Sequence, residues 1–105
     1  MAKDIHELRF NLVEKIQNSE PGTYVIRVVD TAIKTLLDSH VQHTIITSFI
    51  DTVNHELERL RMEFGEEEQL RKVFHIAATR LRKLKMNLTQ QAKIPVLLTI
   101  NQHIT

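Results

Sequence analysis

The six histidines are the side chains in this sequence best suited to bind a metal ion or to move protons near neutral pH. His40 and His43 lie three residues apart, and Asp51 and His55 lie four apart, so each pair would share one face of a helix. However, the chain contains neither Glu-x-x-His nor His-Glu-x-x-His, the recurring motifs of helical di-iron and zinc sites. The pattern favours solvated helix surface over a metal site, and we expect neither metal nor cofactor.

Motifs that depend on glycine or cysteine are absent from the sequence. Gly22 and Gly65 are the only glycines, whereas a nucleophile elbow, a phosphate loop and a dinucleotide fingerprint each require closely spaced glycines. Because the chain has no cysteine, disulfides and thiolate metal sites are excluded as well. The sequence therefore predicts a protein that is not an enzyme, with no small-molecule substrate evident.

A run of basic residues between positions 71 and 85 is the best sequence argument for binding nucleic acid, since phosphate contacts need a stripe of Lys and Arg. Its members are Arg71, Lys72, Arg80, Arg82, Lys83 and Lys85. Residues 51–68 carry seven acids and two bases, and the whole chain has a net charge of only +1. Neutralisation within the chain is therefore the preferred interpretation, and a nucleic-acid-associated regulatory protein is the alternative.

Two seven-residue repeats predict the elements that would carry these side chains. Apolar residues follow spacings of four and three up to residue 64, and a second such series starts at residue 70. The first series is Ile46, Ile50, Val53, Leu57, Leu60 and Phe64, and the second is Leu70, Phe74, Ala77, Leu81, Leu84 and Leu88. The two series are out of phase, and Gly65 separates them. We predict helices over 40–64 and 66–91 in a tight antiparallel hairpin, with Gly65 as a left-handed helix end.

The hairpin also predicts which residues of its two helices face each other. A turn at Gly65 places Leu57 opposite Phe74, so that the two apolar series pack together. The same register predicts two flanking charge pairs, Glu58 with Lys72 and Asp51 with Arg80. Surface pairs of this kind contribute only about 0–1 kcal/mol each, so they define the register more than the stability.

Two shorter helices are predicted before the hairpin. The first covers residues 4–17, where apolar residues form a single stripe, and the turn-rich segment 18–23 ends it. The second covers about 22–38. Its first part, residues 24–29, is rich in β-branched side chains, so a strand there is the alternative.

The chain ends in the apolar tail KIPVLLTINQHIT, residues 93–105. Val96, Leu98 and Ile100 alternate with other residues at the period of two that is typical of a half-buried strand. An extended or strand-like tail would need a partner for its backbone groups, either residues 24–29 or another chain. A helix with Pro95 in its first turn and a disordered tail are the alternatives.

These elements together predict an all-α fold. We expect a four-helix bundle over residues 1–93, dominated by the long hairpin at 40–91, and a separate apolar tail over 94–105. A chain of 105 residues with 42% apolar and 26% charged residues suits one globular domain. The sequence has no apolar run long enough to cross a membrane and no signal peptide, so we expect a cytoplasmic protein without membrane contact.

The two hairpin helices carry apolar residues outside the two seven-residue series. These residues form additional apolar faces that another surface must bury. The candidate interface residues are Val41, Ile45, Phe49, Val73, Ile76, Val96, Leu98 and Ile100. Either the first two helices cover them or a second copy does, and the sequence favours a homo-oligomer, a dimer or larger. The function predicted is therefore a non-enzymatic protein–protein interaction or assembly module.

Overall fold

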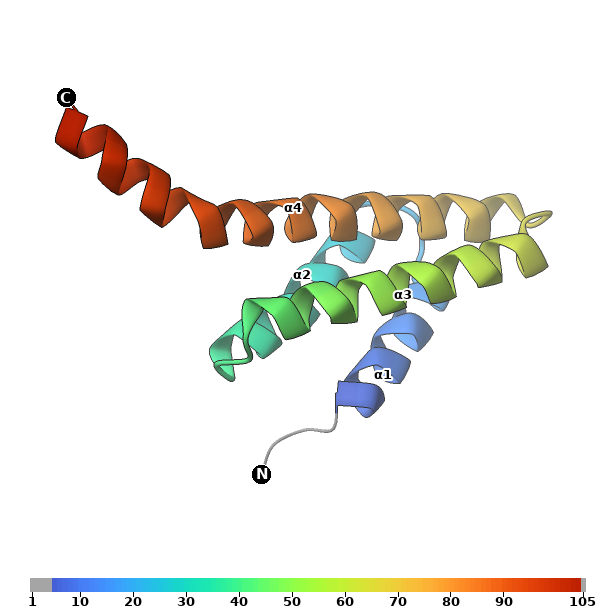
Figure 1. The fold of residues 1–105 in the computed structure, drawn as a ribbon. Coiled ribbons are helices and arrows are strands. Elements are labelled where there is room, and N and C mark those ends of the chain that lie inside the picture. Colours follow the sequence, from blue (N-terminus) through green and yellow to red (C-terminus); the bar gives the residue numbers. More distant parts are fainter. Residues whose placement is uncertain (1–4, 105) are drawn as a thin grey trace.

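The computed structural model of the chain describes the backbone of residues 5–104 and the side chains of residues 5–90. Four helices follow one another along the chain (Figure 1). They are α1 (Ile5–Gln17), α2 (Thr23–Asp38), α3 (His43–Phe64) and α4 (Glu68–Ile104). No strand occurs between residues 5 and 104, so the predicted all-α helical bundle is confirmed. The alternative of a strand at residues 24–29 is wrong, because this segment forms the first turns of α2.

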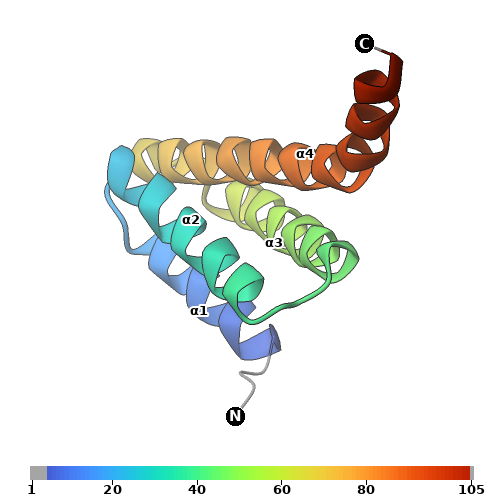
Figure 2. The ribbon, with the colours of Figure 1, turned by 90° about the vertical axis from the view of Figure 1, so that its left-hand side faces the viewer.

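The link between α1 and α2 lies where the sequence predicts a break. The buried hydroxyl of Ser19 donates to the carbonyl of Lys15 at 2.5 Å and so closes the end of α1. Gly22 then precedes α2 with φ 136° and ψ −158°, a conformation that essentially only glycine adopts without strain. This glycine allows the chain to turn within five residues and to bring α2 back along α1 (Figure 2).

The hydrophobic core lies between all four helices and includes most of the two predicted apolar series. From α1 and α2 it takes Leu12, Val13, Ile16, Val25, Val29, Ala32, Ile33 and Leu36. From the two series it takes Ile46, Ile50, Val53, Leu57, Leu60, Phe74, Ala77, Leu81 and Leu88. Burying an aliphatic or aromatic side chain of this size contributes about 1.5–3 kcal/mol relative to exposing it. Leu57 and Phe74 are almost fully buried and line the same groove between α3 and α4, as the hairpin predicts.

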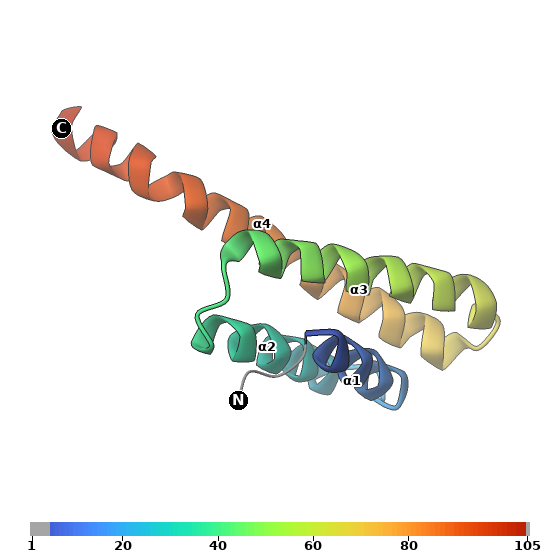
Figure 3. The ribbon, with the colours of Figure 1, turned by 60° about the horizontal axis from the view of Figure 1, so that its bottom comes forward.

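Figures 2 and 3 show how the helices are arranged around this core. α3 and α4 run antiparallel as a long hairpin, and α1 and α2 form a second, shorter pair that packs across one side of it. Within the described residues, no helix packs on the opposite side of the hairpin, where a groove runs between α3 and α4.

The link of the hairpin differs from its prediction in length and in backbone conformation. It comprises residues 65–67, because α4 begins only at Glu68. Gly65 has φ −65° and ψ −11°, which is the right-handed helical region and not the predicted left-handed one. The left-handed residue of the described chain is instead His40, with φ 60°, in the link between α2 and α3.

The C-terminal segment predicted as an extended or strand-like tail is the end of α4 instead. No strand among the described residues offers it an edge, so a helix is the conformation that satisfies its backbone within the segment itself. α4 has 37 residues and α3 has 22, or about 55 Å and about 33 Å of helix. α4 therefore runs past the bundle and changes direction near its C-terminus (Figure 1). Pro95 lies in this part, and proline inside a helix removes a hydrogen bond and produces a kink.

Candidate interaction surfaces

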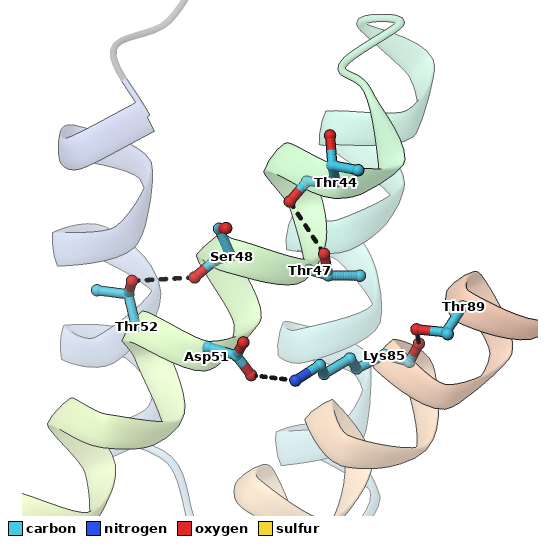
Figure 4. A network of polar contacts seen from close by, with 7 residues as sticks. All are labelled: Thr44, Thr47, Ser48, Asp51, Thr52, Lys85 and Thr89. Atoms are coloured by element: carbon cyan, nitrogen blue, oxygen red, sulfur yellow. Dashed lines mark hydrogen bonds and ion pairs between the residues drawn. The ribbon is translucent and has the colours of Figure 1, made fainter. Parts of the chain in front are cut away.

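The charged contacts of the hairpin correct the predicted register. Asp51 accepts a hydrogen bond from Lys85 at 2.6 Å across α3 and α4 (Figure 4), so the predicted pair of Asp51 with Arg80 is wrong. Glu58 and Lys72 line the same groove, as the hairpin predicts, but their described ion pairs are with other residues. Each of these two residues pairs within its own helix, Glu58 with Arg61 at 2.5 Å and Lys72 with Glu68 at 3.3 Å. Arg80 binds Asp30 of α2 instead, and the intrahelical partners of Glu58 and Lys72 lie three and four residues away in sequence.

Arg80 is a structural residue that joins α4 to α2. Its guanidinium donates two hydrogen bonds to the carboxylate of Asp30, at 2.7 and 2.9 Å, and the two side chains are only 28% and 40% exposed. This bidentate hydrogen bond raises the pKa of Arg80 above its ordinary value, against the opposing effect of burial. Arg80 and Lys85 are therefore committed to contacts within the chain, which removes two of the six basic residues from the predicted nucleic-acid surface.

The remaining basic residues are exposed on α4, and three of them border a groove. This groove runs between α3 and α4 on the side away from α1 and α2 and has a volume of about 510 Å³. We refer to it as the basic groove. Its lining residues are Leu57, Glu58, Arg61, Arg71, Lys72, Phe74, His75, Ala78 and Arg82. Lys83 is exposed but lies outside it.

Arg61 is the member of the basic groove that sequence reasoning missed. It lies on α3 within the acidic stretch, so its own neighbours in sequence suggest neutralisation and not a basic site. Only the pairing of the two helices brings it beside the cations of α4. The hydrogen bond from Arg61 lowers the pKa of Glu58, and the charge of Arg82 lowers it as well, which places Arg82 close to Glu58 across the groove.

The predicted interface residues divide into three groups. Phe49 and Val73 are 4% and 0% exposed in the core of the single chain, so their assignment to an interface is corrected. The first two helices cover them, which is the alternative that the sequence left open. Val41 and Ile76 pack partly buried against the same core, and Ile45 is 45% exposed. Val96, Leu98 and Ile100 lie in α4 beyond residue 90, outside the described side chains.

A second groove lies between α1 and α3 and carries exposed apolar side chains. It consists of two adjoining hollows of about 400 and about 170 Å³ that share Arg9. Phe10 borders the larger one and is 67% exposed, and Ile45 borders the smaller one. Val13 and Phe49 lie at the base of the groove. We refer to it as the α1–α3 groove. The sequence does not predict this groove, because a single exposed apolar residue such as Phe10 forms no periodic pattern.

The histidine pairs considered for metal binding are not gathered into a site. His40 lies in the link before α3, Asp51 is bound to Lys85, and His55 is exposed on α3. In the described part of the chain, no three His, Asp or Glu side chains are placed to hold a metal ion together. The hydroxyls near Asp51 bond to their own helix, Thr47 to the carbonyl of Thr44 and Thr52 to that of Ser48 (Figure 4).

Comparisons with protein-family models, with curated proteins and with solved structures give no match to this chain. None of the helices, over the residues described, is both long enough and apolar enough to cross a membrane.

Proposed function

We propose that this protein is a non-enzymatic assembly module, in which the C-terminal part of α4 of one copy binds the α1–α3 groove of a second copy. The observation that carries this proposal is that α4 continues well past the other three helices (Figures 1 and 3). Leu88 is the last buried side chain described on this helix. The backbone of the segment that follows runs away from the other three helices (Figures 1 and 3).

The sequence of this segment is unsuited to an isolated helix in water. A helix of about 15 residues without tertiary contacts is marginal even in alanine-rich sequences, and here Pro95 removes one of its hydrogen bonds. The segment is also apolar, since helical spacing places Leu97, Ile100 and Ile104 on one stripe. An apolar stripe of this kind gains stability when another surface covers it.

The α1–α3 groove offers a surface of matching size, with the exposed apolar side chains of Phe10 and Ile45 among polar and charged lining residues. α1 has 13 residues, or about 20 Å of helix, and residues 94–104 would form a helix of about 16 Å. The exposed rings and methyls of Phe10 and Ile45 along the groove would be covered by the same contact. Because the C-terminal segment points away from its own α1 (Figures 1 and 2), the groove that it reaches belongs to another copy. Reciprocal exchange between two copies would give a closed two-fold dimer, the commonest symmetric assembly.

The test is the mass of the protein in solution, measured by light scattering after size exclusion over a range of concentrations. We expect the unmodified chain to form a dimer. Ile100→Glu in the segment and Phe10→Glu in the groove should each weaken the dimer at least tenfold, because a charge would enter an apolar contact. Gln102→Glu and Tyr24→Glu are the matched controls, since they add the same charge to the segment and to an exposed aromatic outside the groove.

Three results would contradict the proposal. A strict monomer at the highest concentration measured would exclude self-association. A dimer that Ile100→Glu leaves unchanged would exclude a role of the C-terminal segment, and one that Phe10→Glu leaves unchanged would exclude the α1–α3 groove as its binding surface.

A further inference from the structure

The basic groove between α3 and α4 has an excess of positive charge within the structure. Four cationic side chains line it, Arg61, Arg71, Lys72 and Arg82, and Glu58 is its one carboxylate. Glu58 is held by Arg61 in a two-point contact, at 2.5 and 3.1 Å. The net charge of the +1 chain is therefore spread unevenly, and this groove carries more cationic side chains than the hollows that border α1.

Arg71 and Arg82 are the two cations of the groove whose described hydrogen-bond acceptors are neutral, although the charge of Arg82 also acts on Glu58. Arg71 donates to the carbonyl of Gly65 at 3.2 Å, and Arg82 donates to the hydroxyl of Thr79 at 3.4 Å. Both contacts are long and exposed, and each engages one nitrogen of a guanidinium that carries five N–H donors. These arginines therefore retain both their charge and most of their hydrogen-bonding capacity for a ligand.

The shape of the site favours a compact anion over an extended one. Binding along a nucleic-acid backbone requires many cations in an exposed row, and the structure withdraws Arg80 and Lys85 from that row into ion pairs. The cations that remain converge from two helices on one hollow of about 510 Å³, which lies within the range of small-molecule sites. Arginine is the residue best suited to the planar, bidentate recognition of phosphate oxygens.

We propose that the basic groove binds the di- or triphosphate group of a small molecule, with Arg71 and Arg82 as its principal contacts. Lys72, which pairs with Glu68 at 3.3 Å, and the exposed His75 also line the groove. The carboxylate of Glu58 would repel an anionic ligand, and its ion pair with Arg61 makes that arginine less available to the ligand. This site is separate from the α1–α3 groove and does not depend on self-association.

Isothermal titration of the full chain with inorganic triphosphate and with a nucleoside triphosphate tests the proposal and separates the two sources of the phosphate group. Binding should weaken as the salt concentration rises. The double variant Arg71→Gln/Arg82→Gln should lose at least tenfold in affinity, since it removes charge-assisted hydrogen bonds while keeping two exposed polar side chains. Lys34→Gln/Lys83→Gln is the matched control, because it lowers the net charge equally at exposed positions outside the groove and should change affinity less than threefold.

Glu58→Gln provides a gain-of-binding test that a folding defect would not mimic. It removes the only carboxylate of the groove and releases Arg61, so triphosphate should bind at least threefold more tightly. Absence of binding by the unmodified chain at low salt would overturn the proposal. Equal losses in the groove and control variants would show diffuse attraction only, and tighter binding of duplex or single-stranded nucleic acid would assign the basic face to that ligand instead.

Discussion

The links at the two ends of α3 reverse the chain under different constraints. In the link before α3, the N–H of His40 donates to the carbonyl of Leu37 and the N–H of Val41 donates to that of Leu36, at 3.0 and 3.1 Å. This pair of bonds is the Schellman motif, which places one residue in the left-handed region. In the link after α3, Gly65 keeps right-handed dihedrals, but a Cβ atom at this position would lie 2.5 Å from the carbonyl oxygen of Arg61.

The comparison separates two properties of glycine that a sequence does not distinguish. At position 65 the backbone conformation suits any residue, and the lack of space excludes a side chain. At position 40 the conformation suits glycine, and a histidine occupies it with φ 60°. A left-handed conformation costs a residue with a Cβ about 1–2 kcal/mol. Of the two links at the ends of α3, the crowded one has a glycine, Gly65, and the one with a left-handed residue has His40. Backbone strain is thus tolerated at His40, whereas a side chain is excluded at Gly65.

The largest effect on this comparison is expected from Gly65→Ala. The added methyl group would meet a backbone atom, so the link must shift, and the free energy of unfolding should fall by about 1–2 kcal/mol. Urea unfolding followed by circular dichroism measures this change. Glu66→Ala is the control at an exposed neighbour and should change stability by less than about 0.5 kcal/mol. A gain in stability, the usual result at an uncrowded right-handed glycine, would contradict the crowding.

The sequence predicts the helices well because burial imposes their period. The two apolar series of the hairpin repeat every seven residues, and most of their members are buried. Link geometry is predicted poorly, because the helical pattern ends before the link and Gly65 alone suggests a left-handed end. The residue that does adopt the left-handed conformation is His40. Histidine is enriched there among non-glycine residues, but non-glycine residues with positive φ are uncommon, so the sequence gives little reason to expect it. The period of the C-terminal tail misleads for a related reason, since its β-branched residues fit a strand, but no strand between residues 5 and 104 offers an edge for it.

The second prediction concerns the strained link, where His40→Gly should increase stability by about 0.5–1 kcal/mol. Glycine removes the strain of the left-handed conformation, and the greater freedom of the unfolded chain offsets part of this gain. The same unfolding experiment measures it. His40→Ala separates the two causes, because alanine removes the imidazole but keeps the Cβ and should give no gain. An equal gain from alanine would assign the strain to the imidazole and not to the backbone.

The candidate surfaces were predictable only in part. The sequence identifies Arg71, Lys72 and Arg82 because they lie close together in one helix. It does not identify Arg61, and it assigns Arg80 to the surface although Asp30, fifty residues earlier, binds it. Contacts between residues distant in sequence follow from the packing of whole helices, so the pattern of charges within one helix does not predict them. The sequence assigns Phe49 and Val73 to an interface for the same reason, since only the folded bundle shows that they are buried within one chain.

The smallest effect is expected from Arg71→Ala, which tests whether a side chain helps to hold the crowded link. Arg71 donates to the carbonyl of Gly65 at 3.2 Å, whereas the described hydrogen bonds of the link at His40 join backbone groups only. Because this contact is exposed, its loss should lower the free energy of unfolding by no more than about 0.5 kcal/mol. The double variant with Gly65→Ala should lose less than the sum of the two single changes, because the shifted link no longer presents its carbonyl to Arg71.

The size of this effect also bears on the basic groove. If Arg71→Ala unfolds at nearly the same urea concentration as the unmodified chain, then Arg71 contributes little to the stability of the fold. Lys83→Ala is the control, because it also removes an exposed cation from α4. A lower triphosphate affinity of a variant that lacks Arg71 is then due to a missing ligand contact and not to a change in the fold. A stability loss of about 2 kcal/mol would instead make Arg71 a structural part of the link after α3. The two links would then differ more, because the described hydrogen bonds of the link at His40 join backbone groups only.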